Sequence, residues 1–114
     1  MITDLKYLQQ MTDNDSASMN EMIELFLNQL AEMRLDIKTL ADSENWCELS
    51  RLAHKIKSSL LVMGAEQMAN DMKELELLAK EGKSVQKYPD YIARFMTMSD
   101  SVEVELRTYL ESAK

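Results

Sequence analysis

His54 is the only histidine in the chain, and the residue types around it could support chemistry on its imidazole ring. Lys57 and Ser58 follow it by three and four residues, the spacings at which side chains on one helix are neighbours. A neutral imidazole nitrogen is a nucleophile that can accept a phosphoryl group. Phosphoryl transfer also needs positioning and charge neutralisation, which a nearby ammonium supplies. The pair His54 and Lys57 therefore suits phosphoryl transfer.

The charge of the surrounding segment agrees with this chemistry. No acidic residue occurs from Leu49 to Ala65, whereas Arg51, Lys55 and Lys57 fall within it, in a chain with a net charge of -7. An anion that approached His54 would meet a locally positive stretch of an acidic protein.

Two other kinds of site fit the segment poorly. A metal site needs further ligands three or four residues away, but those positions hold Ser50, Arg51, Lys57 and Ser58, so no metal is expected. A Ser-His hydrolase would lack an orienting acid and an oxyanion hole. One alternative stays open, namely a non-catalytic helical adaptor that binds a partner through the His54 face without being phosphorylated.

The helix that carries His54 should begin after Ser43, a residue type that favours the N-cap position. At about 100° per residue, its apolar stripe from Trp46 to Met63 is centred about 130° from His54, so His54 should face solvent. Gly64 should end or bend the helix. The exposed face should also carry Cys47, Ser50, Lys57, Ser58 and Leu61.

The rest of the chain also shows helical spacing of apolar residues, with only two glycines and one proline. Besides the helix with His54, the pattern predicts a short helix over Asp4–Met11 and a long one from Met19 to near Ala41. It also predicts a helix over Glu66–Lys80 and a last helix that begins near Pro89. The fold class is therefore all-α. We expect residues 1–114 to form one domain, an antiparallel up-down-up-down four-helix bundle with a short N-terminal capping helix.

Composition excludes several partners. The negative net charge disfavours nucleic acid, whose binding requires clustered Lys and Arg. No apolar run is long enough to span a membrane, and no targeting segment is apparent, so a cytoplasmic location is expected. Cys47 is the single cysteine, which fits a reducing compartment. A monomer is expected.

The segment resembles the histidine-containing phosphotransfer (HPt) domains of two-component phosphorelays. The family pattern has an alanine, the phosphorylated histidine, a lysine three residues on, small residues, and a glycine ten residues past the histidine. This chain has Ala53, His54, Lys57, Ser59 and Gly64 at those positions. Leu75 and Glu76 resemble a later leucine-glutamate pair of the family.

The resemblance implies that His54 carries a phosphoryl group between the aspartates of receiver domains. The chain would then be a phosphocarrier without kinase activity and without a cofactor of its own, and Mg²⁺ would belong to the receiver. Lys57 would hold the phosphoryl oxygens, while Cys47, Ser50, Lys55, Ser58 and Leu61 would lie in the docking face. One position departs from the family, because Ser58 stands where glycine is common.

Overall fold

The computed structural model describes residues 1–112, which form helices joined by short connections and contain no strand. The all-α fold class predicted from the sequence is therefore confirmed for this part of the chain. Its helices are α1 (Lys6–Met11), α2 (Ser16–Asp42), α3 (Trp46–Val62), α4 (Glu66–Glu81) and α5 (Tyr88–Ser112), with a short 3₁₀ helix, η1 (Val85–Lys87), before α5.

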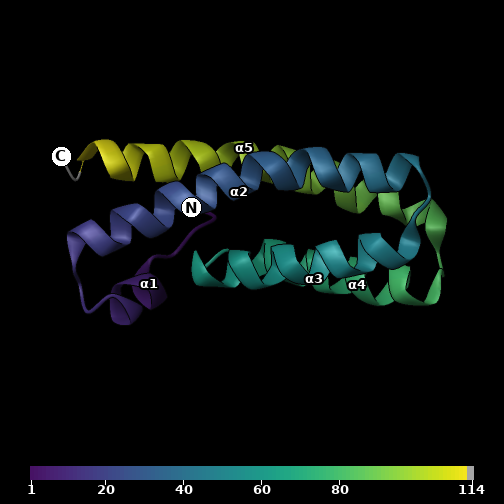
Figure 1. Ribbon diagram of the computed structural model, residues 1–114, viewed down its shortest axis with the longest axis horizontal. Coiled ribbons are helices and arrows are strands. Elements are labelled where there is room, and N and C mark those ends of the chain that lie inside the picture. Colours follow the sequence, from purple (N-terminus) through teal and green to yellow (C-terminus); the bar gives the residue numbers. More distant parts are fainter. Residues whose placement is uncertain (113–114) are drawn as a thin grey trace.

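The four long helices lie lengthwise in an elongated bundle that measures 44 × 21 × 20 Å (Figure 1). α3 pairs with α4, α2 packs against both α3 and α5, and α4 also contacts α5. Within residues 1–112, no helix has both the length and the apolar content that a membrane span requires.

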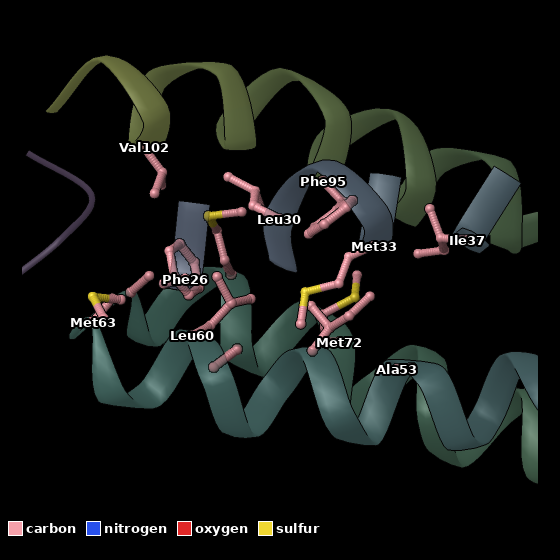
Figure 2. Close-up of a cluster of buried hydrophobic side chains, with 14 of the residues drawn as sticks. Phe26, Leu30, Met33, Ile37, Ala53, Leu60, Met63, Met72, Phe95 and Val102 are labelled. Atoms are coloured by element: carbon pink, nitrogen blue, oxygen red, sulfur yellow. The ribbon is translucent and has the colours of Figure 1, made fainter. Parts of the chain in front are cut away.

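The core lies between the helices and is built from their apolar stripes (Figure 2). In α3 the predicted stripe is buried, except that Trp46 is half-buried and meets the Tyr88 ring edge-on at 5.1 Å between centroids. Tyr88 is almost fully buried although the sequence pattern did not place it in the core. Pro89 lies in the first turn of α5, as predicted, and the Tyr88 hydroxyl donates to the Leu78 and Lys83 carbonyl oxygens at the end of α4.

The starts of α2 and α3 differ from the predicted ones, and the structure shows which side chain caps each helix. The N-cap of α3 is Asn45, whose side chain accepts a hydrogen bond from the Glu48 amide at 3.3 Å, and Ser43 instead ends α2. α2 starts at Ser16 rather than Met19, because the Asp15 carboxylate accepts from the Ser18 amide at 3.1 Å. A side-chain acceptor satisfies amides that have no partner within the helix.

α1 covers one end of the bundle, as a capping helix was predicted to do, although it begins at Lys6 rather than Asp4. At 1.5 Å per residue, α2 is about 40 Å long and α3 only about 26 Å, so part of α2 extends beyond α3. α1 lies beside that extension (Figure 1). Leu8 of α1 is completely buried, which shows that α1 completes the core there.

Gly64 ends α3 as predicted, and its backbone explains why glycine is needed. Its φ is +70°, a conformation that other residues rarely adopt. A Cβ atom at this position would overlap the backbone of Asp4. The Asp4 amide also donates to the Met63 carbonyl at 3.1 Å. The chain before α1 therefore packs directly on the turn between α3 and α4.

Candidate functional site

His54 lies on the solvent side of α3, as the stripe predicted. Its side chain is 59% exposed, whereas Ala53 and Ile56 on the same helix are completely buried. The ring is therefore accessible from solvent while the helix beneath it is fixed by the core.

The carboxylate of Glu76, on α4, reaches the imidazole. Its Oε2 atom lies 3.0 Å from His54 Nδ1, and its Oε1 atom lies 3.4 Å from Lys57 Nζ. Lys57 Nζ is also 3.4 Å from His54 Nδ1. Lys57 and Glu76 are each only 21% exposed at their side chains, so the three groups form a compact cluster at the α3–α4 contact.

Glu76 determines which imidazole nitrogen is free. An ionised carboxylate only accepts hydrogen bonds, so the Nδ1 atom beside it carries the proton and donates to it. A neutral imidazole then has its lone pair on Nε2. Nε2 has no hydrogen-bond partner within residues 1–112, and the exposed ring presents it to solvent. The arrangement produces a nucleophilic nitrogen that is open to a partner.

Ser50 was predicted on the exposed face, and that prediction is wrong. Only 8% of the residue is exposed, and its hydroxyl donates to the Glu76 carbonyl oxygen at 2.8 Å. The contact is direct because α3 and α4 pack closely and a serine is small enough to lie between them. Ser50 therefore joins α3 to the residue whose carboxylate holds His54.

The other predicted face residues differ in their relation to the imidazole. Cys47 is exposed and, with His54 and Glu76, lines a shallow depression between α3 and α4. Leu61 is 47% exposed. The Ser58 hydroxyl donates to the His54 carbonyl oxygen at 3.2 Å, which holds it against its own helix. Lys55 lies on the side of α3 that faces α2, away from Glu76.

The surface near the imidazole is rich in cations. Arg51 and Lys80 line the same depression as His54, on α3 and α4 respectively. Arg51 forms an ion pair of 2.8 Å with Glu48, one turn before it. Within residues 1–112, no group of three or more His, Cys, Asp or Glu side chains is placed to hold a metal ion.

The contact of Glu76 with His54 was not predicted from the sequence, because 22 residues separate them. The exposed face around His54 was predicted from the residues of α3 alone, and the residues placed on that face include no carboxylate. The available signal was the position of Glu76 directly after Leu75, a buried residue of the α4 stripe. A long side chain at the edge of a buried stripe can reach an adjacent helix, as Glu76 does here.

Comparison with known families identifies the chain. A family model for the Hpt domain matches residues 21–114, which make up most of the chain. No curated protein and no solved structure gave a match. The matched region contains α3 with His54 and α4 with Glu76. The chain therefore belongs to the Hpt domain family, whose members are phosphocarriers in two-component phosphorelays.

Proposed function

We propose that Nε2 of His54 accepts a phosphoryl group from the aspartyl phosphate of one receiver domain and passes it to the aspartate of another. The observation that supports this role best is the hydrogen bond between His54 Nδ1 and Glu76, which leaves Nε2 as the free nucleophile on an exposed ring.

The transfer requires no proton to leave the imidazole. The Nε2 lone pair forms a bond to phosphorus, and the bond between phosphorus and the receiver's aspartate oxygen breaks, which releases the carboxylate. The ring then carries a proton on Nδ1 and a phosphoryl group on Nε2, and thus a positive charge. Glu76 faces that charge from 3.0 Å and stabilises it. In the onward step, a second receiver's carboxylate attacks phosphorus and the neutral imidazole returns.

Lys57 has a second role in this proposal. Its ammonium pairs with Glu76 before transfer and lies within one turn of the imidazole, so a short movement brings it to the phosphoryl oxygens. The receiver supplies Mg²⁺ and the remaining charge neutralisation. His54 and Lys57 are thus the reacting and stabilising residues, and Glu76 and Ser50 are positioning residues.

The exposed residues Cys47, Lys55, Ser58 and Leu61 form the proposed docking face. We further propose that the long helices alternate in direction in an up-down-up-down order, and that the protein acts as a cytoplasmic monomer. A monomer leaves the His54 face free for a receiver.

The test is incubation of the protein with a receiver domain that carries a radiolabelled aspartyl phosphate. The label should move to His54 and should be labile in acid and stable in base, as expected for a phosphoramidate. His54→Gln is the control and should take up no label. Label that survives acid, or that persists in His54→Gln, would overturn the proposal, and binding without transfer would favour an adaptor.

A further inference from the structure

We propose that α1 forms one side of the receiver-docking surface and that Tyr7 is its main contact residue. This inference rests on the proposed function, because it assigns the partner's contacts around the same histidine. It concerns the segment of the chain that lies before the region matched by the family model, residues 21–114.

A groove joins α1 to the helix that carries His54. Its walls come from the chain before α1, from α1 itself, from the second half of α3 and from the start of α4. The residues that line it include Asp4, Lys6, Tyr7, Ser58, Leu61 and Glu66. Ser58 and Leu61 belong to the proposed docking face, so the groove is continuous with that face.

The distances place the near end of this groove beneath a receiver of ordinary interface size that docks on His54. Ser58 and Leu61 lie about 6 Å and about 10 Å from His54 along the α3 axis. A specific protein interface buries about 800 Å² on each partner, the area of a disc about 16 Å in radius. A receiver centred on Nε2 that buries this area therefore covers Leu61 and extends toward the groove beyond it.

The groove offers a contact of the kind that dominates interfaces. Tyr7 is 52% exposed and Leu61 is 47% exposed, so an apolar ring and an apolar side chain border the groove in solvent. The Tyr7 hydroxyl forms no hydrogen bond with any side chain or backbone group of residues 1–112. Tyrosine is enriched among the few interface residues that contribute most of the binding energy. We therefore expect an apolar side chain of the receiver to fill the groove against Tyr7 and Leu61.

α1 is held rigidly enough to act as part of a binding surface. The Glu105 carboxylate of α5 accepts hydrogen bonds from the Ile2 amide at 3.0 Å and from the Thr3 hydroxyl at 2.7 Å. On the other side, Asp4 bonds to Met63 and packs on Gly64. A preorganised contact loses less conformational entropy on binding than a mobile one.

Tyr7 lies apart from the groups that react. The reacting cluster of His54, Lys57 and Glu76 lies inside that region, and Tyr7 lies outside it. Contacts from α1 can therefore alter which receivers bind without altering the chemistry at Nε2.

The experiment measures phosphoryl transfer from a labelled receiver domain, chosen because it transfers to the unaltered protein, as a function of receiver concentration. Tyr7→Ala should raise the apparent KM for the receiver about five- to thirtyfold and leave the rate at saturation within about twofold. Val104→Ala is the matched control, since Val104 is also exposed but lies on α5, which does not pack beside α3. It should change neither quantity.

A second measurement uses the unaltered protein and needs no substitution. Amide hydrogen exchange in α1 should slow when the receiver binds. Exchange that slows around His54 but not in α1, or a Tyr7→Ala variant that matches Val104→Ala, would overturn this inference. In both cases the receiver still phosphorylates His54, so the proposed function would stand. Absence of His54 phosphorylation by any receiver would instead overturn the proposed function itself.

Discussion

His54 on α3 and Glu76 on α4 are joined by a hydrogen bond of 3.0 Å between Nδ1 and Oε2, across 22 residues of sequence. The bond links the reacting side chain to a second helix, so both the orientation of the ring and the location of its proton depend on the α3–α4 contact. A histidine that is 59% exposed is thereby bonded to a carboxylate that is only 21% exposed.

Replacement of Glu76 should therefore affect transfer in a graded way. Glu76→Ala removes the acceptor at Nδ1 and should slow transfer about tenfold, since a charge-assisted hydrogen bond at a partly exposed position contributes about 1 to 2 kcal/mol. Glu76→Gln keeps a carbonyl acceptor and should lose less. Glu24→Ala, an exposed carboxylate on α2, is the control. Equal rates for Glu76→Ala and Glu24→Ala would show that Glu76 does not position the imidazole.

The prediction from sequence succeeded where a single helix carries the information. The stripe from Trp46 to Met63 placed His54 on the exposed side, and the glycine at position 64 marked the end of α3. These features follow from the helical period and from backbone conformation, which are local.

Features that depend on two helices were missed. Ser50 is polar and lies near the border of the α3 stripe, so helical geometry alone placed it in solvent, whereas α4 covers it. Glu76 joins the cluster for the same reason, because the α3–α4 contact brings its carboxylate to His54. Contacts between helices depend on which helices pair and in what register. The spacing of residues within one helix does not reveal either.

The exposure of His54 predicts how two neighbouring substitutions affect stability. His54→Ala should change the free energy of unfolding by no more than about 0.5 kcal/mol, as surface substitutions do. Ile56→Ala should cost about 2 to 5 kcal/mol, because Ile56 is completely buried and its removal leaves a cavity. Urea denaturation of both variants measures the difference. Equal losses would mean that α3 is rotated relative to the core.

Ser58 tests how closely a receiver must approach α3. Ser58→Leu should block transfer through bulk one turn from the imidazole. Ser58→Gly should leave transfer unchanged or faster, at a cost in helix stability of up to about 1 kcal/mol. The existing hydrogen bond to the His54 carbonyl holds the serine hydroxyl along the helix, so its loss should not slow transfer. A sharp decrease in the transfer rate of Ser58→Gly would show that the hydroxyl contacts the phosphoryl group.

The link between α5 and the N-terminal segment should make stability depend on pH through Glu105. Burial raises the pKa of this carboxyl, but hydrogen bonds from Ile2 and Thr3 and the charge of the N-terminus outweigh burial, so the pKa is lowered overall. The stabilisation is complete above the unfolded pKa of about 4.3 and is lost as pH falls through the lower folded value. Thermal unfolding of the protein and of Glu105→Gln from pH 7 to pH 3 measures this. Their stability difference should shrink below about pH 4, and a constant difference would contradict the assignment.

The two lysines that follow His54 should differ in how their loss affects transfer. Lys57 Nζ lies 3.4 Å from both the imidazole and Glu76, whereas Lys55 lies on the α2 side of α3. A charge-assisted hydrogen bond to phosphoryl oxygens contributes roughly 1.5 to 3 kcal/mol. Lys57→Ala should therefore slow transfer, or shorten the lifetime of phosphorylated His54, by about one to two orders of magnitude.

Salt distinguishes the two effects. Lys55→Ala should slow transfer less, and only by weakening the long-range attraction between the protein and its receiver. That attraction is screened within about 8 Å at 0.15 M ionic strength, so the deficit of Lys55→Ala should fade as salt increases. The deficit of Lys57→Ala should persist, because the ammonium lies next to the reacting group and is largely shielded from solvent. The transfer rate and the phosphohistidine lifetime of both variants at low and high salt make the comparison. If Lys55→Ala is the more damaging and its effect ignores salt, then Lys57 is not the residue that holds the phosphoryl group.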